Sequence, residues 1–395
     1  MAAVVGKAPS LVIRAIVGWQ ASRIPDPVVR LHFLRRTVGD RTTWNPVSAA
    51  GREHWRDRRV KLVLALTAML LLPAGAITGG GLLWNRGLIV PANAVGSASY
   101  AVPQVWAVEQ NKDFETYSNG LRIERRYETG NEARRYDVYP TGFEDSGRSE
   151  ERTTPAGIVF HTTESPQADF QEDQTRRIRR IGTALLEYVR NERAYHYMVD
   201  RFGRVWRIVR ETDSADHAGY SVWADAKWTY TGLNRAFLGI SVEALTQSNS
   251  RSSEATPAQL HALQALTEML RAKYNIPAGN CATHAQVSVN PDNMQAGYHY
   301  DWAASFPYAG IGLPNNYSLP TPSLWVFGFT YDESLVRVTG EPFWKGLALG
   351  EDQLRQNATA HGMSVPLYRQ TLIKRYRKVL STSKAKTEKS KENTG

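Results

Sequence analysis

The residues of this chain best suited to chemistry follow a short apolar run. Residues 157–160 are rich in β-branched and aromatic side chains, which predicts a buried strand, and His161, Thr162 and Thr163 come directly after it. Open α/β sheets usually place their ligand-binding residues at such strand ends. A single histidine in this position is more often structural than catalytic, so its role depends on what the rest of the chain supplies.

The elements that would position these residues can be predicted from periodicity. Apolar residues at three- and four-residue spacing predict an amphipathic helix, and the arginines between them give it a basic face that either is solvated or contacts an anion (Ile178, Ile181, Leu185, Val189; Arg176, Arg177, Arg179, Arg180). Residues 194–209 predict a hairpin, and residues 237–244 predict another strand. A second helix begins at Thr256, as its cap, and Pro257. Asn119-Gly120 predicts a tight hairpin turn before all of these elements.

Composition limits the possible partners and cofactors. The chain has 395 residues, with 48 Lys and Arg against 38 Asp and Glu. Its formal charge of +10 suits a polyanionic neighbour such as nucleic acid, anionic lipid or a cell-wall polymer. The single cysteine, Cys281, excludes an intrachain disulfide and a four-cysteine zinc knuckle.

One segment predicts a membrane anchor. Residues 62–84 carry no charge and are numerous enough to cross a bilayer core as a helix, which we place at 60–84. A buried core helix or a cleaved signal peptide is the alternative, but the segment starts far from Met1 for a signal. Arginines cluster just before it at 52, 56, 58 and 59, whereas Arg86 stands alone after it. This asymmetry predicts a single-pass protein with a cytoplasmic N-terminus and a periplasmic or extracellular domain.

Composition shifts divide the chain into six segments. We predict a basic cytoplasmic segment (1–59), the transmembrane helix (60–84), a linker with a small β-hairpin unit (85–150), a main domain (151–305), an extension that wraps this domain (306–380) and a disordered basic tail (381–395). Within the linker unit, the polar residues 129–152 are predicted to form a loop. One or two helices are expected in residues 351–380.

The order of motifs in residues 150–305 resembles that of the zinc-dependent N-acetylmuramoyl-L-alanine amidases, which share a fold with phage lysozyme-type amidases and animal peptidoglycan recognition proteins. The motifs are the strand ending in His161, the long helix, the Tyr195-His196 hairpin, His217-Ala218-Gly219, the strand 238–242, the capped helix, Thr283-His284, Gly297 and Asp301-Trp302. The resemblance implies an α/β fold with a mixed central β-sheet flanked by helices. It also implies a zinc site in a surface groove that holds the substrate.

The resemblance assigns two zinc ligands and leaves the third open. His161 and His284 fall on the first two ligand positions of the family, and neutral histidine nitrogens suit zinc. Family members usually carry the third ligand two residues before a glycine; if that glycine is Gly297, the position holds Gln295, a poor ligand. We favour His299 as the replacement because it is the best donor nearby. Asp292, or loss of the metal, are the alternatives.

Catalytic and substrate-contacting residues follow from the same resemblance. Tyr195 matches a catalytic tyrosine that could donate a hydrogen bond to the developing oxyanion. Where many members have a catalytic glutamate this chain has Ser241, and Glu243 is the candidate replacement because it lies two residues further along the same strand face. The remaining candidates are substrate contacts and a core residue: His217, Thr162 and Asn293 are predicted to contact the substrate, and His196 to be a buried core histidine.

The implied function is a membrane-anchored peptidoglycan amidase. It would hydrolyse the amide between N-acetylmuramic acid and L-alanine of the stem peptide with zinc-activated water, so the expected partners are peptidoglycan or muropeptides and, through residues 60–84, a membrane. The alternative is a metal-free peptidoglycan-binding recognition module, which Ser241 and Gln295 favour. Nucleic-acid binding is not expected, because the chain has no recognition motif and its basic tail is predicted to lie outside the cytoplasm.

Overall fold

The computed structural model describes residues 101–141, 149–246 and 255–392, with side chains described through residue 382. All of them belong to the unit Arg86–Gly395. The predicted cytoplasmic segment (1–59) and transmembrane helix (60–84) lie outside the described residues. Within the described ranges, no helix combines the length and the apolar character needed to cross a membrane.

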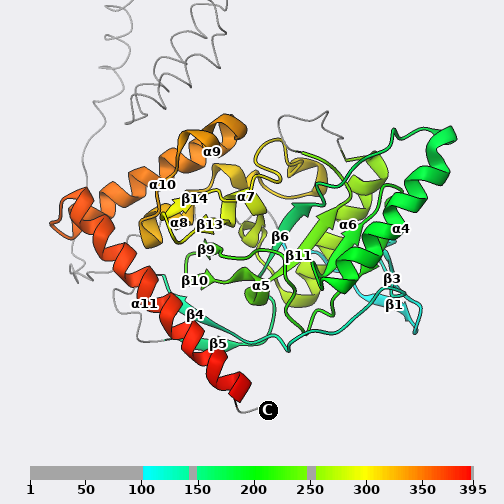
Figure 1. Ribbon diagram of the computed structural model, residues 1–395, viewed down its shortest axis with the longest axis horizontal. Coiled ribbons are helices and arrows are strands. Elements are labelled where there is room, and N and C mark those ends of the chain that lie inside the picture. Colours follow the sequence, from blue (N-terminus) through cyan, green and yellow to red (C-terminus); the bar gives the residue numbers. More distant parts are fainter. Residues whose placement is uncertain (1–100, 142–148, 247–254, 393–395) are drawn as a thin grey trace, which may run out of the picture. The chain divides into compact units, whose positions relative to one another are not determined.

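The centre of the fold is a mixed eight-stranded sheet (Figure 1). Its strands lie in the order β1-β2-β3-β8-β7-β11-β6-β12. β6 pairs in parallel with β11 on one side and β12 on the other, whereas β7 and β8 form the predicted antiparallel hairpin. The predicted mixed central sheet is therefore confirmed. The strands span Ala107–Gln110 (β1), Phe114–Tyr117 (β2), Arg122–Glu124 (β3), Gly157–Thr162 (β6), Tyr197–Val199 (β7), Val205–Arg207 (β8), Phe237–Val242 (β11) and Cys281–Thr283 (β12).

The central strands are covered on both faces. Every residue of β6 and β11 is buried, which explains their nearly continuous apolar sequence. Tyr197 and Val199 of β7 pack in one core cluster with Leu266 of α6 (Pro257–Tyr274). Met198, between them, packs in another cluster with Leu186 of α4 (Thr175–Asn191). Because neighbouring residues of a strand face opposite ways, α4 and α6 cover opposite faces of the sheet.

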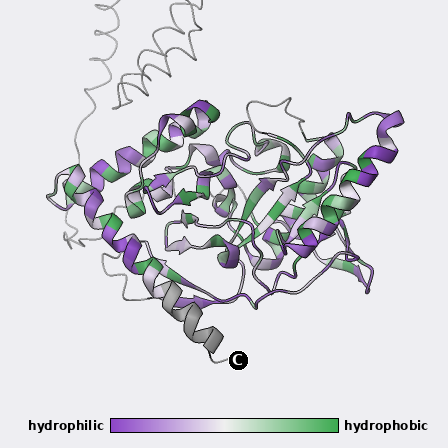
Figure 2. Ribbon diagram, viewed as in Figure 1, coloured by the Kyte–Doolittle hydropathy of each residue, from purple (hydrophilic) through white to green (hydrophobic). Residues whose placement is uncertain are grey.

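The two helices predicted in the main domain, α4 and α6, form where their sequence patterns predict. α6 begins with a capping box, in which the Thr256 hydroxyl accepts the Gln259 N–H and the Gln259 side chain accepts the Thr256 N–H. α4 buries one stripe and exposes its arginines. Figure 2 shows the same division, with hydrophobic residues along the central strands and a mixture of hydrophilic and hydrophobic residues along α4.

Residues 129–152 were predicted to form a loop, and this prediction is wrong. They contain β4 (Tyr136–Pro140) and β5 (Glu150–Arg152), which join β10 (Trp228–Thr231) and β9 (Val222–Ala224) in a four-stranded antiparallel sheet ordered β5-β4-β10-β9. β4 was not predicted because its segment is polar in composition. Of its five residues, only Tyr136, Val138 and Tyr139 are buried. Its partner β10 also lies far along the chain.

The C-terminal part of the chain is helical (Figure 1). Its helices span Pro322–Phe327 (α8), Glu333–Val338 (α9), Glu341–Ala360 (α10) and Val365–Glu392 (α11). α11 continues to Glu392, through most of the tail predicted to be disordered. Lysine and glutamate are frequent in that stretch, and their high helix propensity favours a helix there. Short elements complete the fold: Leu233–Ala236 (α5), His284–Val287 (α7), Val289–Asn290 (β13) and Gln295–Ala296 (β14).

Candidate metal centre and active site

Two adjacent parallel strands bring His161 and His284 together. His161 lies near the end of β6, and His284 is the first residue of α7, directly after β12. Because β6 and β12 are parallel neighbours, their carboxyl ends meet at the same edge, and the two ring centroids lie 4.4 Å apart. Both side chains are buried, with 1% of His161 and 6% of His284 exposed.

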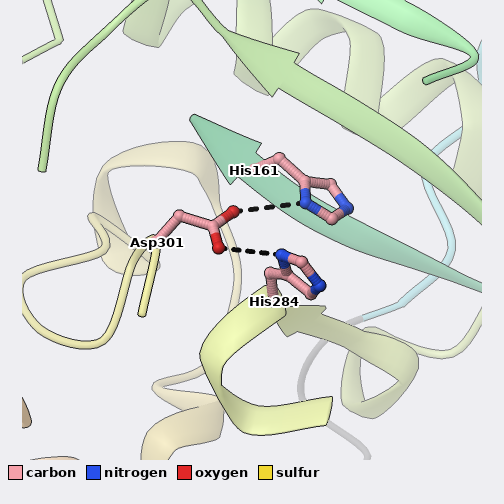
Figure 3. Close-up of side chains that lie close together, drawn as sticks. All are labelled: His161, His284 and Asp301. Carbon is pink, nitrogen blue, oxygen red and sulfur yellow. Dashed lines mark hydrogen bonds and ion pairs between the residues drawn. The ribbon is translucent and has the colours of Figure 1, made fainter. Parts of the chain in front are cut away.

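Asp301 completes this group from a loop (Figure 3). Its Oδ2 lies 3.2 Å from His161 Nδ1, and its Oδ1 lies 2.8 Å from His284 Nδ1. One candidate ligand atom from each of the three residues lies within 4.8 Å of the other two. The next residue anchors the loop, since the Trp302 N–H donates to the Thr246 hydroxyl at 3.2 Å.

Electrostatics favours the protonation states of His161 and Asp301 that a metal requires. Burial and, next, the neighbouring His284 lower the pKa of His161 to about 4, against the opposing effect of Asp301. His161 is therefore neutral at pH 7. Burial alone would raise the pKa of Asp301, but the two histidines, His284 first, hold it well below its usual range. Asp301 is therefore a carboxylate.

The group fits a divalent cation such as zinc. Two imidazoles and one carboxylate are a recurring protein donor set of catalytic zinc sites, which keep a further position open. His284 Nε2 is buried and has no hydrogen-bond partner among the described residues. Since nothing else fixes the tautomer of His284, its Nδ1 can present a lone pair to a cation.

Residues 151–299 match the family model described as N-acetylmuramoyl-L-alanine amidase. This segment resembles that family, and we call residues 151–305 the amidase domain. Among curated proteins, the chain is 34% identical over 89 residues to the N-acetylmuramoyl-L-alanine amidase AmiD of Escherichia coli. The match covers 22% of this chain and 31% of that protein, so the chain spans about a third of the length of this relative.

Solved structures are also similar to the chain. AmpDH3 from Pseudomonas aeruginosa, in complex with anhydromuramic pentapeptide, is 21% identical with a TM-score of 0.31, covering 40% of this chain and 58% of that chain. AmiD from E. coli, in complex with the substrate anhydro-N-acetylmuramic acid-L-Ala-D-gamma-Glu-L-Lys, is 23% identical with a TM-score of 0.30, covering 42% and 60%.

In the amidase domain, the third candidate ligand is Asp301, which is not among the donors predicted from the sequence. His299, the residue we favoured, stacks on His284 with ring centroids 4.5 Å apart but is not part of the three-residue group. Asp292 is exposed in the turn between β13 and β14. The sequence feature that could have indicated Asp301 was the Asp301-Trp302 pair at the end of the family motif. The direction of the Asp301 side chain could not be predicted from it, because Trp302 has a left-handed backbone (φ 56), which no sequence pattern predicts for tryptophan.

Tyr195 lies beside the candidate metal ligands of the amidase domain. Its ring centroid is 5.1 Å from that of His161, and it lines a pocket of about 320 Å³ with Thr163, Leu185 and Tyr188 among others. Its backbone is left-handed (φ 63), which is uncommon for a bulky residue and often marks a functional site. Burial, and next the charge of Asp301, raise the pKa of its phenol, so the hydroxyl keeps its proton.

The predicted substrate contacts have different positions. His217 is only 7% exposed, and its Nδ1 lies 3.1 Å from His161 Nε2, so it contacts a candidate ligand. Thr162 is buried, and its hydroxyl bonds to the Glu164 carboxylate. Asn293 is exposed and bonds to Gln295 within the β13–β14 turn. His196 is fully buried and accepts the Gly239 N–H at 3.0 Å, as expected of a core histidine.

The structure does not bring Glu243 into the His161–His284–Asp301 group. β11 ends at Val242, and the Glu243 carboxylate accepts the Arg201 N–H at 3.1 Å, while a Cβ at Gly182 of α4 would meet it at 3.3 Å. Burial raises its pKa to about 7. Ser241, in contrast, pairs in register with His161 across β11 and β6.

Replacing Glu243 with glutamine should remove a pH-dependent loss of stability. Between its ordinary pKa of 4.5 and about 7, the folded protein holds a proton that the unfolded chain releases, so the free energy of unfolding falls as pH rises through this window. At 1.36 kcal/mol per pKa unit, the wild type loses about 3 kcal/mol by pH 8, whereas Glu243→Gln keeps that stability. Urea titrations at pH 5 and pH 8 measure the difference, and an equal pH dependence in both proteins contradicts it.

Proposed function

We propose that the amidase domain hydrolyses the amide between N-acetylmuramic acid and L-alanine of the peptidoglycan stem peptide. The observation that carries the proposal is the convergence of His161, His284 and Asp301 within and beside a segment of the amidase family. A bound zinc ion would supply Lewis acidity toward the amide carbonyl and toward water. His161 and His284 would hold it through Nδ1, and Asp301 through its carboxylate.

Tyr195 is the residue best placed to act on the substrate. Its hydroxyl remains protonated and its ring contacts His161, so it can donate a hydrogen bond to the oxygen of the amide as negative charge develops there. The pocket that it lines would receive the substrate beside this point. Glu243 is not assigned a step, because its carboxylate is directed toward Arg201 and α4.

Location forms a separate part of the proposal and rests on sequence alone. The uncharged segment 60–84 and the arginines before it favour a single-pass membrane protein with a cytoplasmic N-terminus. The amidase domain would then lie in the periplasm or outside the cell, where peptidoglycan is found.

The test is zinc content measured together with hydrolysis in the full-length protein. Elemental analysis should find one zinc per chain, and release of the stem peptide from muropeptides should stop on chelation and return with added zinc. His161→Ala should lose both zinc and hydrolysis. Zinc far below one per chain together with intact muropeptide binding would instead favour the metal-free recognition module. Full hydrolysis by His161→Ala would refute the assignment of the site.

A further inference from the structure

A hydrogen-bonded chain connects the candidate ligand His161 to the backbone of β11. His161 Nε2 lies 3.1 Å from His217 Nδ1, and His217 Nε2 lies 3.4 Å from the carbonyl oxygen of Phe237. Both imidazoles are buried, with 1% of His161 and 7% of His217 exposed. Few water molecules can therefore compete for these contacts.

The carbonyl at the end of this chain determines where the protons lie. A backbone carbonyl only accepts hydrogen bonds, so the hydrogen of a neutral His217 must be on Nε2. Its Nδ1 is then an acceptor, and His161 must donate to it from Nε2. A neutral His161 that carries its hydrogen on Nε2 has a bare lone pair on Nδ1.

That lone pair faces another acceptor. His161 Nδ1 lies 3.2 Å from Asp301 Oδ2, and an ionised carboxylate has no hydrogen to donate. Two acceptors at this distance repel each other unless a cation lies between them. We propose that His217 is a positioning residue, which holds His161 in the Nε2–H tautomer so that Nδ1 is presented, together with Asp301, to a metal ion. This inference rests on the proposed metal site and extends it to a residue that would not touch the metal.

The fold provides a dedicated place for the His217 ring. An added Cβ on Gly239 of β11 would lie 2.5 Å from His217 Cγ, so the ring occupies the space that any side chain at position 239 would need. The Asn234 side-chain oxygen accepts the N–H groups of both His217 and Ala218, at 3.1 and 2.6 Å, and fixes the backbone.

The other buried histidine beside His217 does not compete for the same role. The ring centroid of His196 lies 5.6 Å from that of His217. Its Nδ1 accepts the Gly239 N–H, and its Nε2 lies 2.7 Å from Arg134 Nη2 and 3.1 Å from the Asp213 carbonyl oxygen. Both nitrogens of His196 are therefore occupied within the core.

The test compares two substitutions of His217 in the full-length protein, with zinc affinity measured by competition against a chromophoric chelator. His217→Phe keeps a ring but removes the acceptor, and should weaken zinc binding about 10- to 100-fold, as loss of a ligand's hydrogen-bond partner typically does. His217→Asn keeps an acceptor oxygen close to the position of Nδ1, and should recover most of the affinity. Unchanged affinity in the Phe variant, or an equal loss in both variants, would overturn the inference.

A second readout needs no metal. Nitrogen-15 spectra of the zinc-free protein labelled at histidine report which ring nitrogen carries hydrogen. His161 should be the Nε2–H tautomer in the wild type and should shift toward Nδ1–H, donating to Asp301, in His217→Phe. An Nδ1–H tautomer in the wild type would overturn the inference even if zinc binds.

Substitution of a glycine that contacts the His217 ring tests the position of this ring without changing any histidine. Gly239→Ala should displace His217 and reproduce the loss of zinc affinity. Gly279→Ala is the matched control, because a Cβ there meets nothing within 4 Å, and it should bind zinc like the wild type. If the wild type itself binds no zinc, the proposed function fails. If it binds zinc and hydrolyses muropeptides while Gly239→Ala and His217→Phe keep full affinity, only the role of His217 fails.

Discussion

Asp301→Asn should remove both zinc binding and hydrolysis while leaving the protein folded. Asparagine has the shape of aspartate but no charge, and it is a poor zinc ligand. The loss of zinc affinity should exceed the roughly 10- to 100-fold effect of removing an outer hydrogen-bond partner, because Asp301 supplies a donor atom directly. Zinc content, chelator competition and muropeptide hydrolysis measure the effect, and thermal unfolding of the zinc-free protein checks the fold.

Asp292→Asn is the matched control for this substitution. Asp292 is an exposed aspartate in the turn between β13 and β14, and it was one of the predicted third ligands. Its replacement should leave zinc content and hydrolysis unchanged. If Asp292→Asn loses zinc while Asp301→Asn keeps it, the ligand set must be reassigned.

Arg207→Met should destabilise the domain by about 3–5 kcal/mol, the cost of breaking a buried ion pair. The guanidinium of Arg207 bonds to both oxygens of Glu115 at 2.7 Å and to Glu211 at 3.1 Å, and all three side chains are buried. Burial opposes ionisation of Glu115, yet Arg207 lowers its pKa to about 2. Methionine fills similar volume but removes the closest cation of the buried Glu115 carboxylate, whereas Glu211 keeps its ion pair with Lys273.

Urea unfolding measures this loss, and its pH dependence identifies the cause. The stabilisation of ionised Glu115 is present above its ordinary pKa of 4.5 and is lost as pH falls toward about 2, so the difference between wild type and Arg207→Met should shrink in acid. Arg355→Met, which removes an exposed partner of Asp352, should cost no more than about 1 kcal/mol. Equal losses in the two variants would show that burial of the Arg207 network does not matter.

The sequence predicts the framework of the site but not its completion. His161 could be located because it follows a recognisable strand, and His284 because it falls on a ligand position of the family that the sequence resembles. The parallel pairing of β6 and β12 brings the two together. Asp301 could not be located in the same way. Its loop follows the left-handed residues Met294 and Gly297 and precedes Trp302, also left-handed, so its path depends on tertiary contacts and not on local propensity.

The prediction of the Glu243 side-chain direction from strand periodicity was wrong because the strand ends before this residue. The two-residue repeat of a strand places Glu243 on the face of Ser241, but β11 ends at Val242 and the glutamate side chain is held by the Arg201 N–H instead. His217 shows a different limit. Its motif was recognised in the sequence, but the contact with His161 depends on the absence of a side chain at Gly239, and only the three-dimensional structure shows that relation.

The position of His284 also affects the mechanical integrity of the sheet. β12 is a three-residue strand at one end of the eight-stranded order, and among the described residues it pairs with β6 alone. A cation held by His161 and His284 would tie the ends of these two strands together, acting as a removable crosslink at the margin of the sheet. Any ligand that binds only the folded state stabilises it by mass action. The supply of metal would therefore determine the stability of the β6–β12 pairing at this edge of the sheet, as well as the activity of the site.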